Sequence, residues 1–331
     1  MHWKDLRSED EHWLGLELMV EKRLTPPSWR VEFASPWYLR ISCEGAPLFW
    51  ARLGAYGSGF WWLNAPAEIP SALEPLRARD VDAFVEPPGS EAWSAAWARH
   101  FAHALAQSPR SPLHEGRWWL LNGFAQMTPA DPRPPHISPW AVAHDVRRYA
   151  SQALASHVCW GFHPTHPLLG LKPPAALSPS RLKVWRKRAR DGTLPPVLAL
   201  FVSPLDGPVV LDGHHRWMAA LEEEVPIPLL MLWPADVRTY SPRVDNREVV
   251  ERLYLQQHSG SPEPKPISVN KLNALAIDAW GGQLSATPRT RAWPIPGRFP
   301  QWDSEVRARL DALGNRIEPE AREHLLRAPK T

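Results

Sequence analysis

Proline is the residue that most constrains this chain, because 38 of its 331 residues are prolines, more than twice the usual share. Each proline fixes its own backbone and lacks an amide donor, which predicts many short elements joined by stiff connections. The run from Pro129 to Pro135 cannot lie inside a helix or a central strand and predicts a linker. We therefore expect a Trp-rich α+β domain over residues 1–130, a module over residues 136–240 and a Pro-rich, partly helical extension over residues 241–331.

Hydrophobic spacing predicts the elements of the first region. Residues 11–24 are expected to form an amphipathic helix, and residues 30–63 an antiparallel meander of short strands. Ser90 is expected to cap a helix over residues 90–107, in which large apolar side chains recur every four positions. The 19 tryptophans are spread along the whole chain, which favours core packing over a binding surface.

Charge and cysteine content exclude few classes of function. A net charge of +3 permits contact with nucleic acid without requiring it. The two cysteines form no Cys-x-x-Cys motif, so neither a zinc knuckle nor a disulfide framework is indicated. The charged N-terminus holds no apolar signal segment, and no apolar run approaches the length of a membrane span. We expect a cytoplasmic protein without a membrane partner.

The most informative segment is Val209–Leu221, which predicts a β-branched strand, a tight turn and a helix. Asp212 is expected to be the N-cap, and Gly213 to let the backbone approach a ligand closely. The unpaired amides of the first helical turn suit a phosphate, and His214, His215 and Arg216 add side-chain donors there. Cations at a helix N-terminus oppose its dipole by roughly 0.3–1 kcal/mol, a conflict that a bound anion would remove.

These residues carry a resemblance to a known family. Gly192–Leu200, a turn, Val209–Leu221 and Val225–Leu229 together resemble the ParB/sulfiredoxin superfamily, over residues 155–235 only. The resemblance implies an α+β fold with a nucleotide-binding module, set between the Trp-rich region and the helical extension. Further helices are expected over residues 138–155, 180–190, 213–223, 245–258 and 304–313, and strands over residues 118–124, 158–162, 197–202, 208–211 and 226–232.

The branches of the superfamily differ at this motif. Sulfiredoxins have a nucleophilic Cys where this chain has His214, so their usual chemistry is excluded, and partitioning proteins that bind CTP have Glu and Arg at positions 214 and 215. The free-serine kinase branch is similar from Asp212 to Arg216, where the motif holds nucleotide phosphates. That branch also uses a glutamate base, and at the matching place this chain has His163 and His166 instead. A histidine can act as a base near neutral pH.

A second feature is the basic segment from residue 181 to residue 190, which holds six cations in ten residues. Lys183, Arg186, Lys187 and Arg190 are candidate contacts to a nucleic-acid backbone. The alternative is a solvated helix face, with Leu182, Trp185 and Ala189 turned inward. The resemblance places this helix near the nucleotide pocket, so both interpretations stay open.

Three hypotheses follow. The first is transfer of phosphate from ATP or ADP, with Mg²⁺ as a candidate companion, to a small-molecule acceptor: Gly213, His214, His215 and Arg216 hold the phosphates, and Asp212, with His214, His215, His163 or His166, serves catalysis. The second is a ParB-like nuclease or a DNA-binding protein. The third is a regulatory module that binds a nucleotide without turning it over. No metal site is assigned, because the histidines have no carboxylate or Cys at matching spacing.

Overall fold

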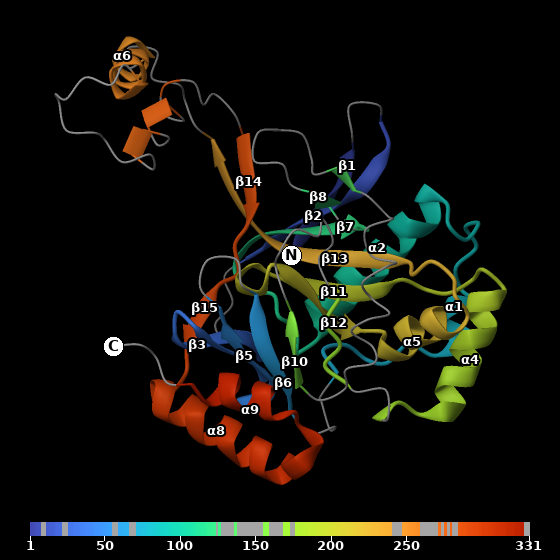
Figure 1. The fold of residues 1–331 in the computed structure, drawn as a ribbon. Coiled ribbons are helices and arrows are strands. Elements are labelled where there is room, and N and C mark those ends of the chain that lie inside the picture. The colour runs from blue at the N-terminus through green and yellow to red at the C-terminus, as the bar shows by residue number, and fades with distance from the viewer. Residues whose placement is uncertain are drawn as a thin grey trace. The chain divides into compact units, whose positions relative to one another are not determined.

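A computed structural model of the chain forms two compact units (Figure 1). The first unit comprises residues 1–126, 134–235 and 288–331, and the second comprises residues 127–133 and 236–287. The structure describes residues 1–7, 11–21, 26–54, 59–65, 71–123, 125–126, 136–137, 155–158, 168–172, 176–239, 247–258, 271–272, 275–276, 279 and 284–327. The helix expected over residues 138–155, all but its last residue, lies outside these residues, and so do His163 and His166.

The larger sheet joins strands from both sides of the expected linker. Its order is β1-β2-β7-β13-β11-β12, with β14 pairing β13. Strands on both sides of the boundary predicted near residue 130 therefore belong to one sheet, and residues 1–126 and 134–235 belong to the same compact unit. The bounds are His2–Arg7 for β1, Trp13–Val20 for β2, Gly116–Asn122 for β7, Val197–Val202 for β11, Gly207–Asp212 for β12, Leu229–Thr239 for β13 and Leu284–Pro288 for β14.

The amphipathic helix expected over residues 11–24 is wrong, because β2 lies there and pairs antiparallel with both β1 and β7. Leu16, Leu18 and Val20 face the main core, at the alternating spacing of a strand. Gly15 permits the close pairing with β7, since an added Cβ would lie 2.4 Å from the Leu120 carbonyl oxygen. A short apolar run is compatible with either a helix or a strand, and here the pairing with β1 and β7 decides for a strand.

The smaller sheet confirms the antiparallel meander. Its order is β10-β6-β5-β4-β3-β15, in which β3 to β6 pair antiparallel in sequence and β15 joins β3 in parallel. The bounds are Trp29–Ser35 for β3, Tyr38–Cys43 for β4, Ala46–Leu53 for β5, Phe60–Asn64 for β6, Ala155–Val158 for β10 and Ala292–Pro294 for β15. A separate two-stranded sheet pairs β8 (Ala125–Gln126) with β9 (His136–Ile137).

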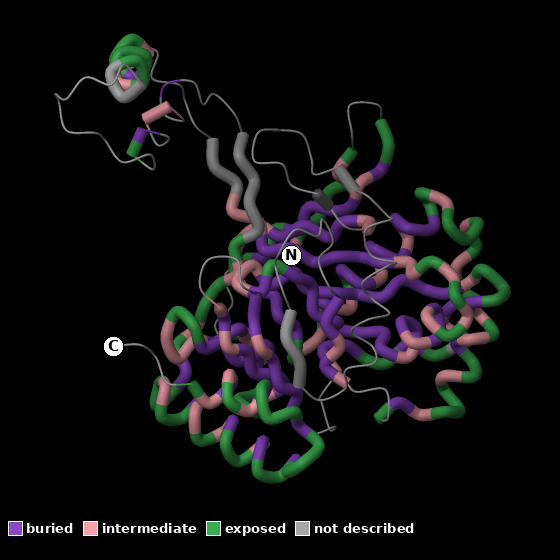
Figure 2. Tube along the Cα trace, viewed as in Figure 1, coloured by how far each residue is buried: buried purple, intermediate pink, exposed green. Residues whose placement is uncertain are grey.

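One apolar core joins the inner faces of both sheets with helix α2 (Glu91–Gln107), and the buried backbone runs through the middle of the first unit (Figure 2). The hydroxyl of Ser90 accepts the amide of Trp93 at 3.1 Å, which confirms the expected cap. Trp97 and Phe101 of this helix are almost completely buried. Trp62 and Trp118 lie in the same core, so these tryptophans serve packing, as expected.

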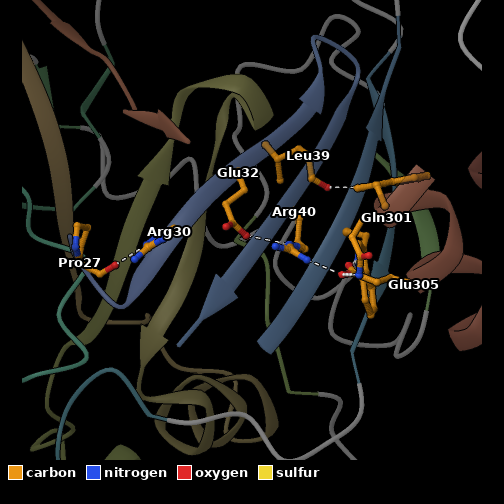
Figure 3. Close-up of polar contacts among 9 residues, drawn as sticks. Pro27, Arg30, Glu32, Leu39, Arg40, Gln301 and Glu305 are labelled. Carbon is orange, nitrogen blue, oxygen red and sulfur yellow. Dashed lines mark hydrogen bonds and ion pairs between the residues drawn. The ribbon is translucent and has the colours of Figure 1, made fainter. Parts of the chain in front are cut away.

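Helices α8 (Arg298–Leu313) and α9 (Pro319–Leu326) cover the other face of the smaller sheet (Figure 1). Buried Arg40 of β4 binds Glu32 of β3 and Glu305 of α8, and the indole of Trp302 donates to the Leu39 carbonyl (Figure 3). This polar cluster fixes α8 on the sheet. The second unit contains α6 (Arg247–His258), close to its expected bounds. In the part of the chain that is described, no helix has the length and apolar character of a membrane span.

Candidate functional site

From residue 179 onward the element order expected for the module is confirmed, whereas the strand expected over residues 158–162 lies, except for Val158, outside the described residues. Helix α4 (Pro179–Arg190) leads to β11, a short turn, β12, helix α5 (His214–Glu222) and β13. Strands β11 and β12 pair antiparallel, whereas β13 runs parallel to β11. Helix α5 therefore connects β12 back to the sheet, and its N-terminus lies at the end of β12 beside α4, with which it packs (Figure 1).

Gly213 forms the turn between β12 and α5. Its φ of +105° belongs to a region that residues with a side chain rarely adopt. An added Cβ would also lie 2.7 Å from Nη2 of Arg216. Gly213 is itself the N-cap, so the expectation that Asp212 caps the helix is wrong. The carboxylate of Asp212 is directed instead to the guanidinium of Arg216.

Arg216 holds this turn from the inside. Its Nη2 donates to Asp212 at 2.7 Å and to the Pro196 carbonyl at 3.0 Å. The guanidinium lies 5.7 Å from the ring centroid of Trp185 and 6.0 Å from that of Phe101. Arg216 is 2% exposed and both of these hydrogen bonds go to groups of the protein itself, so the structure shows Arg216 in an internal role rather than as an exposed phosphate donor.

His214 and His215 hold the segment that precedes α4. Nε2 of His214 accepts the amide of Leu171 at 3.1 Å, and Nε2 of His215 accepts the amide of Ser178 at 3.0 Å. Burial, followed by the charge of Lys172, lowers the pKa of His214 to about 3. Burial, followed by the charges of Arg181 and Lys172, lowers the pKa of His215 to about 4. Both rings are neutral at pH 7, and each carries its proton on Nδ1.

Two more cations come to the same place from outside the motif. The segment Leu168–Lys172 runs beside β12 through a parallel bridge between Leu169 and Val209, and this bridge brings Lys172 to the start of α5. Arg181 comes from the first turn of α4. Burial, followed by the charge of Arg181, lowers the pKa of Lys172.

These groups line one pocket, which we call the α5 pocket. It has a volume of about 60 Å³ and is partly open to solvent. Among its described lining residues Asp212 is the one carboxylate, and Arg216 pairs with it. Lys172 and Arg181 form no ion pair with any carboxylate in the described ranges. The described lining residues are Trp29, Ser71, Pro75, Leu171, Lys172, Arg181, Trp185, Leu211, Asp212, Gly213, His214, His215 and Arg216.

The basic helix α4 is partly neutralised. Arg186 and Arg190 both donate to Glu223 at the end of α5, and Arg186 also pairs with Glu222. Lys183 and Lys187 are exposed, while Trp185 and Ala189 are buried, as the solvated-face interpretation predicts. Two of the four candidate nucleic-acid contacts are thus engaged within the protein.

The candidate bases and a metal site are the last predictions to consider. His163 and His166 lie outside the described residues, and among the residues that are described no three His, Cys, Asp or Glu side chains gather as metal ligands. Lys172 and Arg181 were not predicted as site residues, because neither belongs to the motif around Gly213. Arg181 lies inside the basic run, and Lys172 reaches the site only through the pairing of Leu169 with Val209.

Comparisons with protein-family models, curated proteins and solved structures give no match to this chain.

Proposed function

We propose that the α5 pocket binds the phosphate groups of a nucleotide. The observation that carries this proposal is the pair Lys172 and Arg181, two cations without a carboxylate partner in the described ranges, beside the first turn of α5. Amides of that turn have no acceptor within the helix, and the helix dipole favours negative charge there. Cations together with a helix N-terminus form a phosphate site.

The histidines support an anionic ligand in a second way. The pKa values of both rings are lowered in part by Lys172, which indicates a positive potential at the start of α5. A bound phosphate would offset that potential. Each neutral ring keeps one Nδ1–H donor, and its Nε2 stays with the backbone amide of the preceding segment.

Binding is better supported than turnover. A general base works best with a pKa near the operating pH, and the pKa values of His214 and His215 lie well below neutrality. Asp212 is engaged by Arg216. We therefore favour a ParB/sulfiredoxin-like module that binds ATP, ADP or another nucleotide and has a regulatory role. Phosphate transfer to a small molecule, with His163 or His166 as base and Mg²⁺ bound with the nucleotide, is the second candidate.

Calorimetry with ATP, ADP, CTP and GTP, each with and without Mg²⁺, tests the proposal. We expect micromolar binding of at least one nucleotide to the wild type. Binding to Lys172→Gln should be roughly tenfold or more weaker, because this variant loses one hydrogen bond to a charged group. The matched control is Lys187→Gln, which removes an exposed cation of α4 outside the pocket. No binding of any nucleotide, or equal losses in both variants, would overturn the proposal.

A further inference from the structure

Lys172 is a half-buried lysine that forms no ion pair with a carboxylate in the described ranges. The other titratable groups that line the α5 pocket are Arg181 of α4, Asp212 of β12, and His214, His215 and Arg216 of α5. Asp212 is the one carboxylate among them, and it is paired with Arg216 at 2.7 Å. The Lys172 amine therefore shares the pocket with more positive than negative charge.

These surroundings favour the neutral form of the Lys172 amine. Burial, followed by the charge of Arg181, lowers the pKa of Lys172, and the attraction of Asp212 opposes both effects. An exposed lysine is almost fully protonated at pH 7, because its pKa is about 10.4. A lysine that lies partly away from water beside another cation is a common form of an activated amine nucleophile. At neutral pH a larger share of Lys172 than of an exposed lysine carries a free electron pair.

The backbone that leads to Lys172 is held in place. Leu169 pairs with Val209 of β12 in a parallel bridge, and the amide of Leu171 donates to Nε2 of His214 at 3.1 Å. Both contacts lie within three residues of Lys172. They fix the start of its side chain beside the first turn of α5, and a fixed nucleophile loses less entropy when it reacts.

The size of the α5 pocket suits a small molecule. Its volume of about 60 Å³ admits roughly four to six water-sized groups, since each needs about 10–15 Å³. A phosphate group with a short carbon chain is of this size. Arg181 and the free amides of the first α5 turn suit the phosphate, which leaves the Lys172 amine for a second group of the ligand.

We propose that Lys172 forms an imine with a small phosphorylated aldehyde in the α5 pocket. The ammonium gives one proton to water, and the free electron pair of the amine attacks the aldehyde carbon. A second N–H proton passes to the carbonyl oxygen, which gives a carbinolamine. The carbinolamine takes up a proton and loses water, so the products are a protonated imine and one water molecule. The recognition of the phosphate rests on the proposed function, whereas the nucleophilicity of Lys172 does not.

The test uses glyceraldehyde 3-phosphate and, as its matched control, glyceraldehyde, each with sodium cyanoborohydride. The hydride reduces an imine to a stable secondary amine, and peptide mass spectrometry then measures the modification of each lysine. At pH 7 we expect Lys172 to react faster than exposed Lys183 in the same sample. This excess should shrink as the pH rises toward 9.5, because exposed amines then lose their protons as well.

The phosphate should direct the aldehyde to Lys172. Relative to Lys183, the phosphorylated aldehyde should modify Lys172 roughly tenfold or more faster than glyceraldehyde does, because a bound phosphate places the carbonyl beside the amine. Inorganic pyrophosphate should protect Lys172. Arg181→Gln should slow the reaction of Lys172, whereas Lys187→Gln, which removes an exposed cation of α4 outside the pocket, should leave it unchanged.

Two contrary outcomes are distinguishable. Modification of Lys172 no faster than that of Lys183 would overturn the inference, and the proposed function would still stand if calorimetry shows that a nucleotide binds. Faster modification of Lys172 with no preference for the phosphorylated aldehyde and no protection by pyrophosphate would overturn phosphate recognition, both here and in the proposed function.

Discussion

Asp212 and Arg216 form a buried ion pair across the turn that starts α5, with 2.7 Å between the carboxylate oxygen and Nη2. Their exposed fractions are 8% and 2%. Because both charges lie away from water, each depends on the other, and this pair sets the shape of the α5 pocket.

Breaking this pair should therefore destabilise the fold strongly. Arg216→Met leaves the Asp212 carboxylate buried without its partner, and a loss of about 3–5 kcal/mol is expected. The double variant Asp212→Asn with Arg216→Met should recover part of that loss, because no charge then stays unpaired. Urea unfolding of the two single variants and the double variant measures the coupling. Additive losses in the double variant would show that the two charges do not depend on each other.

Gly213→Ala should destabilise more than an ordinary glycine replacement at positive φ. The matched control is Gly192→Ala, where φ is +68° and an added Cβ meets nothing within 4 Å. That control isolates the backbone strain, about 1–2 kcal/mol. Gly213→Ala adds the displacement of the Arg216 guanidinium, so a larger shift of the urea midpoint is expected. Equal shifts in the two variants would contradict the close approach of Arg216 to Gly213.

The two histidines should make stability fall as the pH falls below about 6.5. Their folded pKa values, about 3 for His214 and about 4 for His215, lie below the unfolded value of 6.5, so the unfolded chain binds protons first. Stability is complete above the unfolded pKa and is lost as the pH falls toward the folded values. His214→Gln should reduce the proton uptake on unfolding near pH 5 by up to about one proton. Unfolding measured from pH 4.5 to pH 7.5 tests this, and an unchanged slope would exclude a buried neutral His214.

The docking of α8 should depend on Arg40. Arg40→Met leaves buried Glu32, 3% exposed, without its cation and removes a contact to Glu305, so a loss of about 3–5 kcal/mol is expected. Arg307→Met is the control on the same helix, because its pair with Asp303 lies on the helix surface and contributes about 0.3–0.5 kcal/mol. Thermal unfolding compares the two variants. Similar losses would mean that the polar cluster in Figure 3 contributes no more than a surface pair.

The parts of the fold that local signals determine could be predicted from the sequence. The Ser90 cap, the meander and the strand–turn–helix around Gly213 each depend on a few neighbouring residues. The apolar spacing of residues 11–24 fits both a helix and a strand, and the pairing of β2 with β1 and β7 makes this segment a strand. The local sequence does not show which distant strands a segment will pair with.

The same distinction applies to the candidate site. The motif from Asp212 to Arg216 correctly marked the start of α5, but the internal use of Arg216 depends on Pro196, Trp185 and Phe101, which lie far along the chain. Lys172 reaches the pocket through the bridge between Leu169 and Val209. The motif therefore predicts where helix α5 begins, and long-range packing determines which cations line the α5 pocket beside it.

The most direct test of phosphate recognition compares Arg181→Gln with Lys183→Gln by calorimetry, using the nucleoside diphosphate that binds best and the corresponding nucleoside. The two residues lie two positions apart on α4, both are exposed, and only Arg181 lines the α5 pocket. We predict that the diphosphate binds the wild type and Lys183→Gln with equal affinity and binds Arg181→Gln roughly tenfold more weakly. For the wild type, the diphosphate should bind more than tenfold more tightly than the nucleoside, because the nucleoside has no phosphate. Equal affinity of diphosphate and nucleoside, or equal losses in the two variants, would contradict phosphate binding in the α5 pocket.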